Sequence, residues 1–285
     1  MSLKVSLLKM LNKCFPLPVH PFNTQASGEM TYAMWQYLKG EDTIKFYLQH
    51  TTTDEMFKDK EVLDVGCGAG GKSLYYLSLG AKSVTGIDVV EHYEQESEEL
   101  CNELGLKGFT FSVQDAAKTN FEDNSFDTII MNDAMEHVSK PKEVLNEMFR
   151  ILKPNGKLYV NFPPYNHPYG AHLSDAIGIP WVQVLFSDKT LIKAYKDLVK
   201  DKEDGQSRIS FRIGLNDNGE EYFSYLNKMS IKRFKKLIQD TNFKIEYYHE
   251  APLRSFLKPL CNGFLKEYFV KMTVCVLEKS NEENK

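Results

Sequence analysis

Residues 61–71 read EVLDVGCGAGG, a short apolar strand that runs directly into a glycine-rich turn. Glycine adopts the left-handed backbone that such a turn requires, and it lets a ligand come close to the main chain. Residues 72–79 follow with apolar side chains at Leu74, Tyr75 and Leu77, a pattern typical of a helix. The order strand, glycine turn and helix predicts a βα unit with a ligand site at its turn.

The same alternation continues toward the C-terminus and predicts the fold class. Strands that alternate with helices form a parallel sheet with both faces covered. We therefore expect an α/β, Rossmann-like, doubly wound fold. The further strands are expected at 83–88, 109–113, 126–131, 156–162, 243–248 and 269–277, and the further helices at 91–104, at 141–152 and after the N-cap residue Ser230.

The segments that do not follow the alternation of strands and helices suggest how the chain is divided. Residues 164–225 are rich in aromatic residues and lack an obvious strand-helix unit, although 188–201 repeats its apolar residues at helical spacing. The expected organisation is an N-terminal helical lid at 1–60, a core at 61–163, an inserted cap at 164–225, completion of the core sheet at 226–277 and a frayed tail at 278–285.

Composition narrows the classes of function. The 285 residues include 35 Lys and Arg against 39 Asp and Glu, a formal charge of −4, so the chain lacks the positive field that nucleic acid requires. Five scattered cysteines without Cys-x-x-Cys spacing predict reduced thiols in the cytoplasm and no metal site. No run approaches the roughly 18 apolar residues of a membrane span.

The glycine turn admits two cofactors. Gly66, Gly68 and Gly71 fit the dinucleotide pattern G-x-G-x-x-G, whereas Gly66, Gly68 and Gly70 after Asp64 fit the D-x-G-x-G-x-G pattern of S-adenosylmethionine (SAM) enzymes. A carboxylate at Asp64 would repel a pyrophosphate but attract the ammonium and sulfonium groups of SAM. The turn therefore favours SAM over NAD, and a turn that merely connects strand to helix is the third reading.

Two further aspartates follow the next strands. Asp88 ends the second strand about 20 residues beyond the turn, where a carboxylate accepts hydrogen bonds from ribose hydroxyls of either cofactor. Asp115 follows the third strand and is placed to accept from an adenine amine, although an Asp there is equally typical of a turn.

Residues 126–138 (FDTIIMNDAMEHV) and 150–156 (RILKPNG) complete a set of ordered motifs that resembles the small-molecule branch of class I SAM-dependent methyltransferases. The resemblance is strong over 60–162 and weak over 226–277. It implies a seven-stranded, mostly parallel sheet with an antiparallel last strand. It also implies cofactor contacts from Asp64, Gly66, Gly68, Gly70, Asp88, Asp115, Ala116 and Asn132, and a lid that carries Trp35.

The methyl acceptor is expected on the far side of the cofactor. The stretch Phe162-Pro163-Pro164-Tyr165 resembles a motif of nucleic-acid methylases, but it follows the fifth strand instead of the fourth, which argues against base methylation. His137 is implied to lie between cofactor and acceptor, as a proton acceptor or as a residue that holds its loop. His172, three residues before Asp175, is an oriented base or part of a turn.

Aromatic residues in the cap form its own small core or contact a ring-bearing or lipid-like acceptor. The sequence therefore predicts a SAM-dependent methyltransferase that acts on a small or medium organic acceptor, with O-methylation favoured. The alternatives are a non-catalytic SAM-binding regulator or assembly factor, and an NAD-linked oxidoreductase. The oligomeric state is not predicted.

Overall fold

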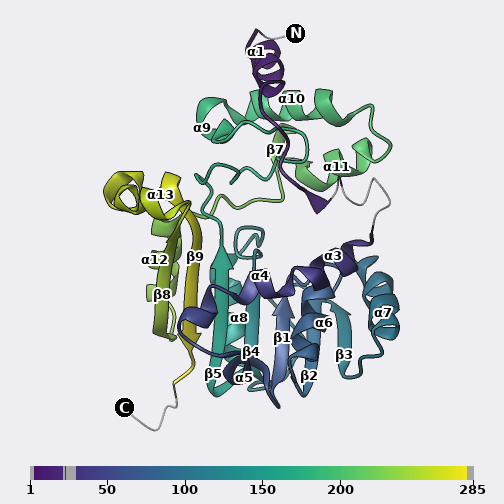
Figure 1. The fold of residues 1–285 in the computed structure, drawn as a ribbon, viewed down its shortest axis with the longest axis vertical. Helices are drawn as coiled ribbons and strands as arrows, with labels where there is room; N and C mark the ends of the chain where they lie inside the picture. Colours follow the sequence, from purple (N-terminus) through teal and green to yellow (C-terminus); the bar gives the residue numbers. More distant parts are fainter. Residues whose placement is uncertain (1–2, 22, 24–29, 281–285) are drawn as a thin grey trace. The chain divides into compact units, whose positions relative to one another are not determined.

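The computed structural model describes residues 3–21, 23 and 30–280, and the chain divides into two compact units (Figure 1). The sheet unit comprises Met30–Phe162, Lys232–Ala251 and Met272–Lys285. The cap unit comprises Met1–Glu29, Pro163–Ile231 and Pro252–Lys271. Each unit is described by itself below.

The sheet unit is built on a seven-stranded sheet in the order β3-β2-β1-β4-β5-β9-β8. Strands β1 to β5 pair with one another in parallel, and β9 is antiparallel to β5. The predicted Rossmann-like, mostly parallel sheet is thus confirmed. Its strands are β1 (Glu61–Val65), β2 (Ser83–Asp88), β3 (Phe109–Val113), β4 (Phe126–Asn132), β5 (Leu152–Phe162), β8 (Lys244–Pro252) and β9 (Val270–Glu278).

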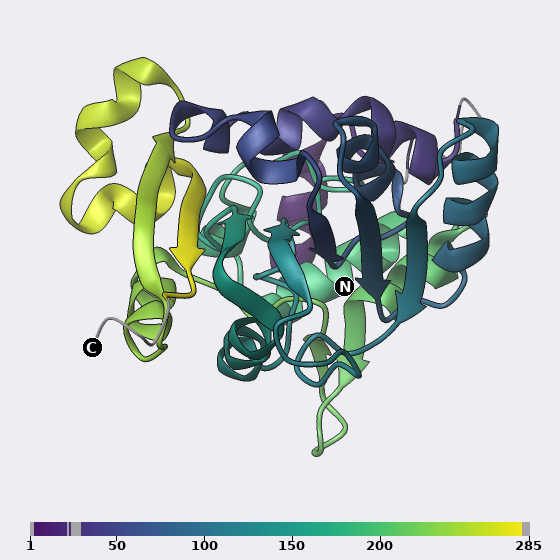
Figure 2. The same cartoon turned by 90° about the horizontal axis from the view of Figure 1, so that it is seen from below.

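Helices cover both faces of this sheet (Figure 2). Helix α8 (Pro141–Ile151) buries Val144, Leu145 and Met148, which recur at helical spacing along one side. The other helices after β1 and β2, and beside β8, are α6 (Gly71–Ser78), α7 (Tyr93–Glu103) and α12 (Ile231–Gln239). The helices expected at 72–79, 91–104 and 141–152 are therefore present, with ends that differ by one or two residues.

The expected N-terminal lid is split between the two units. Four short helices join the sheet unit, where Tyr47, Met56 and Phe57 are fully buried in its core. The preceding helix, α1 (Leu3–Asn12), belongs instead to the cap unit. The four are α3 (Tyr32–Leu38), α4 (Gly40–Ile44), η1 (Tyr47–Gln49) and α5 (Thr53–Phe57).

The cap unit has a core of its own in which α1 packs on α10, through buried residues that include Val5, Leu8, Leu191 and Tyr195. This agrees with the reading of the cap aromatics as a small core. Its elements are α9 (Val182–Leu185), α10 (Asp188–Val199), α11 (Gly205–Arg212), β6 (Ile213–Leu215), β7 (Glu221–Phe223), η2 (Ser255–Cys261), η3 (Gly263–Leu265) and α13 (Lys266–Phe269).

One element of the cap was not expected, and two expectations about the chain's organisation need correction. The cap contains an antiparallel hairpin, β6–β7, because Asn216 to Gly219 form a tight turn in which Gly219 has a φ of +76°. Residues 252–271 join the cap unit, although the sequence assigned them to the core sheet. Glu278 is not frayed, since it pairs with Lys157 in the sheet, while 281–285 lie outside the described residues.

Candidate functional site

The glycine turn between β1 and α6 has the left-handed backbone that the sequence predicts. The φ angles of Gly66, Gly68 and Gly70 are +70°, +56° and +75°. A Cβ atom on Gly66 would lie 2.9 Å from the Cβ of Ala134, and one on Gly70 would lie 2.7 Å from the Cβ of Ser97. A side chain at these positions would strain the left-handed backbone and would lie too close to neighbouring atoms. The turn therefore offers bare main chain to a ligand.

Asp88 is fastened to this turn. Its Oδ2 accepts a hydrogen bond from the Gly68 amide at 2.9 Å, and its Oδ1 accepts one from the Val90 amide at 3.0 Å. Because each carboxylate oxygen can accept more than one hydrogen bond, both retain capacity for a further donor. The structure thus holds the carboxylate of Asp88 rigidly beside the glycine turn, as a ribose-binding residue requires.

Asp64 lies within β1 and is buried. Its Oδ2 accepts a hydrogen bond from the Ser73 hydroxyl at 2.6 Å, which links β1 to α6. Burial raises the pKa of Asp64 to about 6, against the opposing effects of the Ser73 hydrogen bond and the Lys72 charge. The position next to the turn agrees with the prediction, but the carboxylate would act on a bound cation as a nearby charge.

Lys72 is a residue of this region that the sequence reasoning missed. Its Nζ lies 3.3 Å from Oδ2 of Asp133, which has a φ of +53° directly after β4. The lysine charge also lowers the pKa of Asp64 and of Glu136, so one cation stands among several carboxyl groups. Acidic groups outnumber it, and this balance fits the sulfonium and ammonium of SAM better than a pyrophosphate.

Asn132, the last residue of β4, uses its side chain within the protein. Its Oδ1 accepts hydrogen bonds from the Tyr47 hydroxyl and from Asn161 Nδ2, both at 2.7 Å, and its Nδ2 donates to the Tyr76 hydroxyl at 3.0 Å. These contacts tie β4 to β5, to η1 and to α6. A cofactor contact from Asn132 would therefore involve its main chain.

Asp115 is exposed and shapes its own turn. Its Oδ1 accepts a hydrogen bond from the amide of Ala117, two residues on, at 2.9 Å. This is the turn-forming role that the sequence left open, and it does not conflict with a contact to adenine. Ala116 between them is half-buried.

Helix α3 is fixed over the glycine turn by Gln36, a second residue that the sequence did not reveal. Gln36 Nε2 donates to the Cys67 carbonyl at 3.1 Å, and the Gly71 amide donates to Gln36 Oε1 at 3.3 Å. The only signal in the sequence was a lone amide among the apolar residues of this helix. Gln36 therefore holds α3 in register with the turn.

Trp35 and Tyr32 lie on the same helix. The Trp35 ring stacks on Tyr32 with 6.1 Å between centroids, and Tyr32 lies 5.8 Å from the ring of Tyr93 in α7. A Cβ on Gly68 would lie 3.3 Å from the Tyr32 ring. The structure thus places Tyr32 directly against the turn and Trp35 one ring further out.

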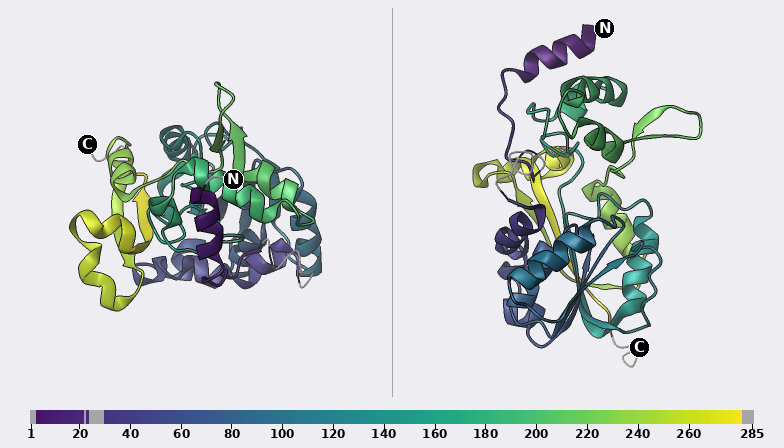
Figure 3. Two further views of the ribbon diagram at one scale, coloured as in Figure 1. Left: turned by 90° about the horizontal axis from the view of Figure 1, so that it is seen from above. Right: turned by 90° about the vertical axis from the view of Figure 1, so that its right-hand side faces the viewer.

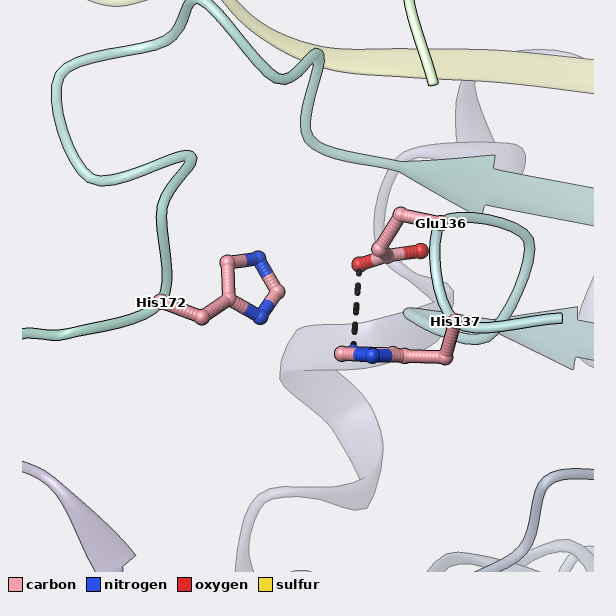
Figure 4. Close-up of side chains that lie close together, drawn as sticks. All are labelled: Glu136, His137 and His172. Atoms are coloured by element: carbon pink, nitrogen blue, oxygen red, sulfur yellow. Dashed lines mark ion pairs between the residues drawn. The ribbon is translucent and has the colours of Figure 1, made fainter. Parts of the chain in front are cut away.

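His137 follows β4 and lies beside a buried carboxyl group (Figure 4). Its Nε2 is 3.9 Å from Oε1 of Glu136, and 35% of its side chain is exposed. Burial, reinforced by the charge of Asp133, raises the pKa of Glu136 well above its usual range. Glu136 is therefore protonated over a wider range of pH and then presents no charge to His137.

His172 belongs to the cap unit, where its backbone has a φ of +50°. Its carbonyl accepts a hydrogen bond from Nε of Arg212 at 3.2 Å. The buried Asp175 carboxylate pairs with Arg212 and Arg208, at 3.1 Å each, and accepts from the Tyr195 hydroxyl at 2.8 Å. Asp175 thus binds two arginines, and one of them, Arg212, holds the main chain at His172.

Comparison with known proteins agrees with this arrangement. Residues 63–160 match the model of a methyltransferase domain family. A sterol 24-C-methyltransferase from Neurospora crassa is 34% identical over 35% of this chain and 26% of its own length. Phosphoethanolamine N-methyltransferase 3 from Arabidopsis thaliana is 34% identical over 35% of this chain and 20% of its own. The chain thus spans about a quarter or less of these two relatives.

A ubiquinone biosynthesis O-methyltransferase from Coxiella burnetii is matched over more of its length, with 29% identity over 62% of this chain and 73% of the relative. Among solved structures, the PH0226 protein from Pyrococcus horikoshii superposes with a TM-score of 0.52 at 20% identity, covering 86% of this chain and 91% of that one. A SAM-dependent methyltransferase from Methanosarcina mazei gives 0.50 at 23% identity, covering 80% and 96%. Residues 63–160 thus match a methyltransferase domain family, and the chain has the fold of a solved SAM-dependent methyltransferase.

Proposed function

We propose that this protein transfers a methyl group from SAM to a hydroxyl group of a small or medium organic acceptor. The observation that carries the choice of oxygen is His137, a partly exposed imidazole beside the buried carboxyl group of Glu136 at the carboxyl end of β4. The named relatives include O-, N- and C-methyltransferases, and of these the O-methyltransferase is matched over most of its length.

The geometry of the sheet unit supports the proposed cofactor contacts. SAM supplies an electrophilic methyl group on a sulfonium when it is bound. Gly66, Gly68 and Gly70 would leave room for it along the main chain, and Asp88 would accept from the ribose hydroxyls. The remaining predicted contacts are adenine recognition by Asp115 and Ala116, a main-chain contact at Asn132, an electrostatic contribution from Asp64 and shielding by Trp35.

His137 would accept the proton that a hydroxyl loses as it becomes a nucleophile. An imidazole can do this only in its neutral form, and burial raises the pKa of Glu136, which opposes the negative charge that would favour the imidazolium. His172 is the second candidate for this role, with its main chain held by Arg212. The rest of the rate enhancement would come from holding the acceptor in line with the methyl group.

The acceptor we propose is ring-bearing or lipid-like. Several aromatic side chains of the cap unit remain exposed after its core is formed, among them Tyr169, Phe211 and Tyr222. None of the five cysteines, all of them among the described residues, forms a disulfide, which suits a reducing compartment such as the cytoplasm. Within the part of the chain that the structure describes, no helix is long and apolar enough to cross a bilayer.

The test is a transfer assay with SAM that carries a trideuterated methyl group. The purified protein is incubated with matched acceptors that differ only in a phenol, an amine or an activated carbon, and the products are identified by mass spectrometry. Label on the phenol oxygen supports the proposal, and label on nitrogen or carbon alone contradicts it. Tight binding of S-adenosylhomocysteine (SAH) without any labelled product would favour the non-catalytic regulator.

A further inference from the structure

Helix α1 carries two apolar faces, and only one of them is used within the cap unit. Val5 and Leu8 are buried against α10. The opposite face bears Leu3, Leu7, Met10 and Leu11, at the i, i+4, i+7 and i+8 spacing of a single helical stripe. Leu3 is 85% exposed and Met10 is 60% exposed. The helix therefore presents a continuous apolar stripe to its surroundings.

The apolar surface extends beyond the helix. Phe15, Leu17 and Val19 are also exposed in the segment that follows α1. Large exposed apolar areas are unusual on a monomeric protein unless they meet a partner or a membrane. We refer to the four stripe residues and these three residues together as the α1 surface.

The formally charged residues of the segment that carries the α1 surface are all lysines. Residues 1–28 contain three lysines, Lys4, Lys9 and Lys13, and no aspartate or glutamate, although the whole chain carries −4. Lys4 and Lys13 are exposed, and Lys9 lies 3.5 Å from Asp197 of α10. Apolar side chains flanked by lysines are typical of helices that lie in the interface of an anionic membrane.

A second part of the cap unit also combines exposed apolar side chains with exposed basic ones. The η2–η3 segment exposes Phe256 and Phe264, by 78% and 86%, and Arg254 and Lys258 beside them are exposed as well. In the right-hand view of Figure 3, α1 and the η2–η3 segment lie toward the same side of this unit. Phenylalanine at the tip of a turn with basic neighbours can insert among lipid headgroups while the cations meet their phosphates.

We propose that the cap unit docks on the surface of an anionic lipid bilayer through the α1 surface and the η2–η3 phenylalanines. A second copy of this chain is a poorer occupant, because a symmetric contact between two α1 surfaces would bring lysines together with no acidic partner from the same segment. The inference goes beyond methyl transfer. Docking would bring the protein to acceptors that reside in the membrane.

The test is co-sedimentation of the full chain with vesicles of phosphatidylcholine alone or with about 30 mol% phosphatidylglycerol. The variant L7E/M10E reverses the character of the stripe at exposed positions. The matched control is L215E, which makes the same kind of change at a leucine of β6 that is 68% exposed. The variants K4A and K13A test the charge, and F256S/F264S tests the second contact.

The wild-type protein and L215E should bind the anionic vesicles, and raising the salt from about 0.1 M to about 0.5 M should weaken this binding. L7E/M10E should bind at least about tenfold more weakly, and loss of each exposed lysine should cost about fivefold. F256S/F264S should also bind more weakly than L215E. SAH affinity should be equal in all variants, because vesicle binding requires neither the cofactor site nor an acceptor.

Three outcomes would overturn the proposal. The first is wild-type protein that stays in the supernatant with anionic vesicles. The second is an L7E/M10E variant that binds as well as L215E. The third is a dimer in analytical ultracentrifugation that dissociates in L7E/M10E while vesicles bind neither protein, since the α1 surface would then belong to a second copy. Each outcome leaves the proposed methyl transfer open to its own assay.

Discussion

Removal of the Asp88 carboxylate should weaken cofactor binding strongly. Asp88 already accepts hydrogen bonds from the amides of Gly68 and Val90, so it is held in one orientation before a ligand arrives. Two further charge-assisted hydrogen bonds to ribose hydroxyls should together contribute about 2–4 kcal/mol, which is a loss of roughly 30-fold to 1000-fold in SAH affinity for D88A. Isothermal titration calorimetry with SAH measures this loss directly.

The same contacts make a control necessary, because D88A also removes acceptors from the glycine turn itself. D88N keeps a carbonyl oxygen that can accept from one amide, so it should preserve more of the turn and lose only part of the affinity. Melting temperatures of both variants report any loss of the fold. Unchanged SAH affinity in a folded D88A variant would refute the assignment of Asp88 to the ribose.

Three more changes test other parts of the site. G68V should abolish SAH binding, since valine would be strained at a φ of +56° and its Cβ would lie 2.8 Å from Gln36 Nε2. If calorimetry showed that G68V binds SAH as the wild type does, the turn would only connect β1 to α6. H137Q should slow methyl transfer to a hydroxyl by a factor of about 10²–10⁴ without changing SAH affinity. The wild-type rate should decrease when the pH is lowered through about 6.5, and a rate that stays constant there would argue against a histidine base. The stability of D64N relative to the wild type should increase as pH rises from about 4 to about 6. The folded-state pKa of Asp64 is raised to about 6, so ionisation of this carboxyl group in the wild type destabilises the fold by about 3 kcal/mol. A difference in melting temperature that stays constant with pH would contradict this.

The sheet was predictable because the residues of each strand, and those directly beside it, indicate where the strand lies. Apolar runs such as 61–65 and 83–88 are bounded by a glycine turn or a polar residue, and strand-helix alternation leaves few topologies. The positive φ angles at Gly66, Gly68 and Gly70 were likewise predictable, since the motif itself requires them. Local sequence carries both kinds of information.

The contacts that complete the site depend on residues far apart in the chain. Gln36 meets Cys67 and Gly71 across more than thirty positions, and Lys72 meets Asp133 across 61. No periodicity within a helix or strand indicates such a pair. The assignment of α1 to the cap unit has the same origin, because it rests on packing against α10.

The β6–β7 hairpin was missed for a different reason. Its strands have only three residues each, too few for alternation to be visible. The Asn218-Gly219 pair between them is nevertheless a strong turn signal, and Asn216 Oδ1 accepts from the amides of Asn218 and Glu220. Turn chemistry could therefore have located the hairpin where hydrophobic patterning could not.

The charge balance at the glycine turn is the basis for assigning SAM to this site, and one calorimetric comparison tests it most directly. The wild-type protein is titrated with SAH and, separately, with NADH under the same buffer and salt. The carboxylates of Asp64 and Asp133 near Lys72 should attract the cationic amino group of SAH and repel a pyrophosphate, so SAH should bind at one site per chain and NADH should give no heat of binding. Binding of NADH at this site with affinity equal to that of SAH, or no binding of SAH, would contradict the account.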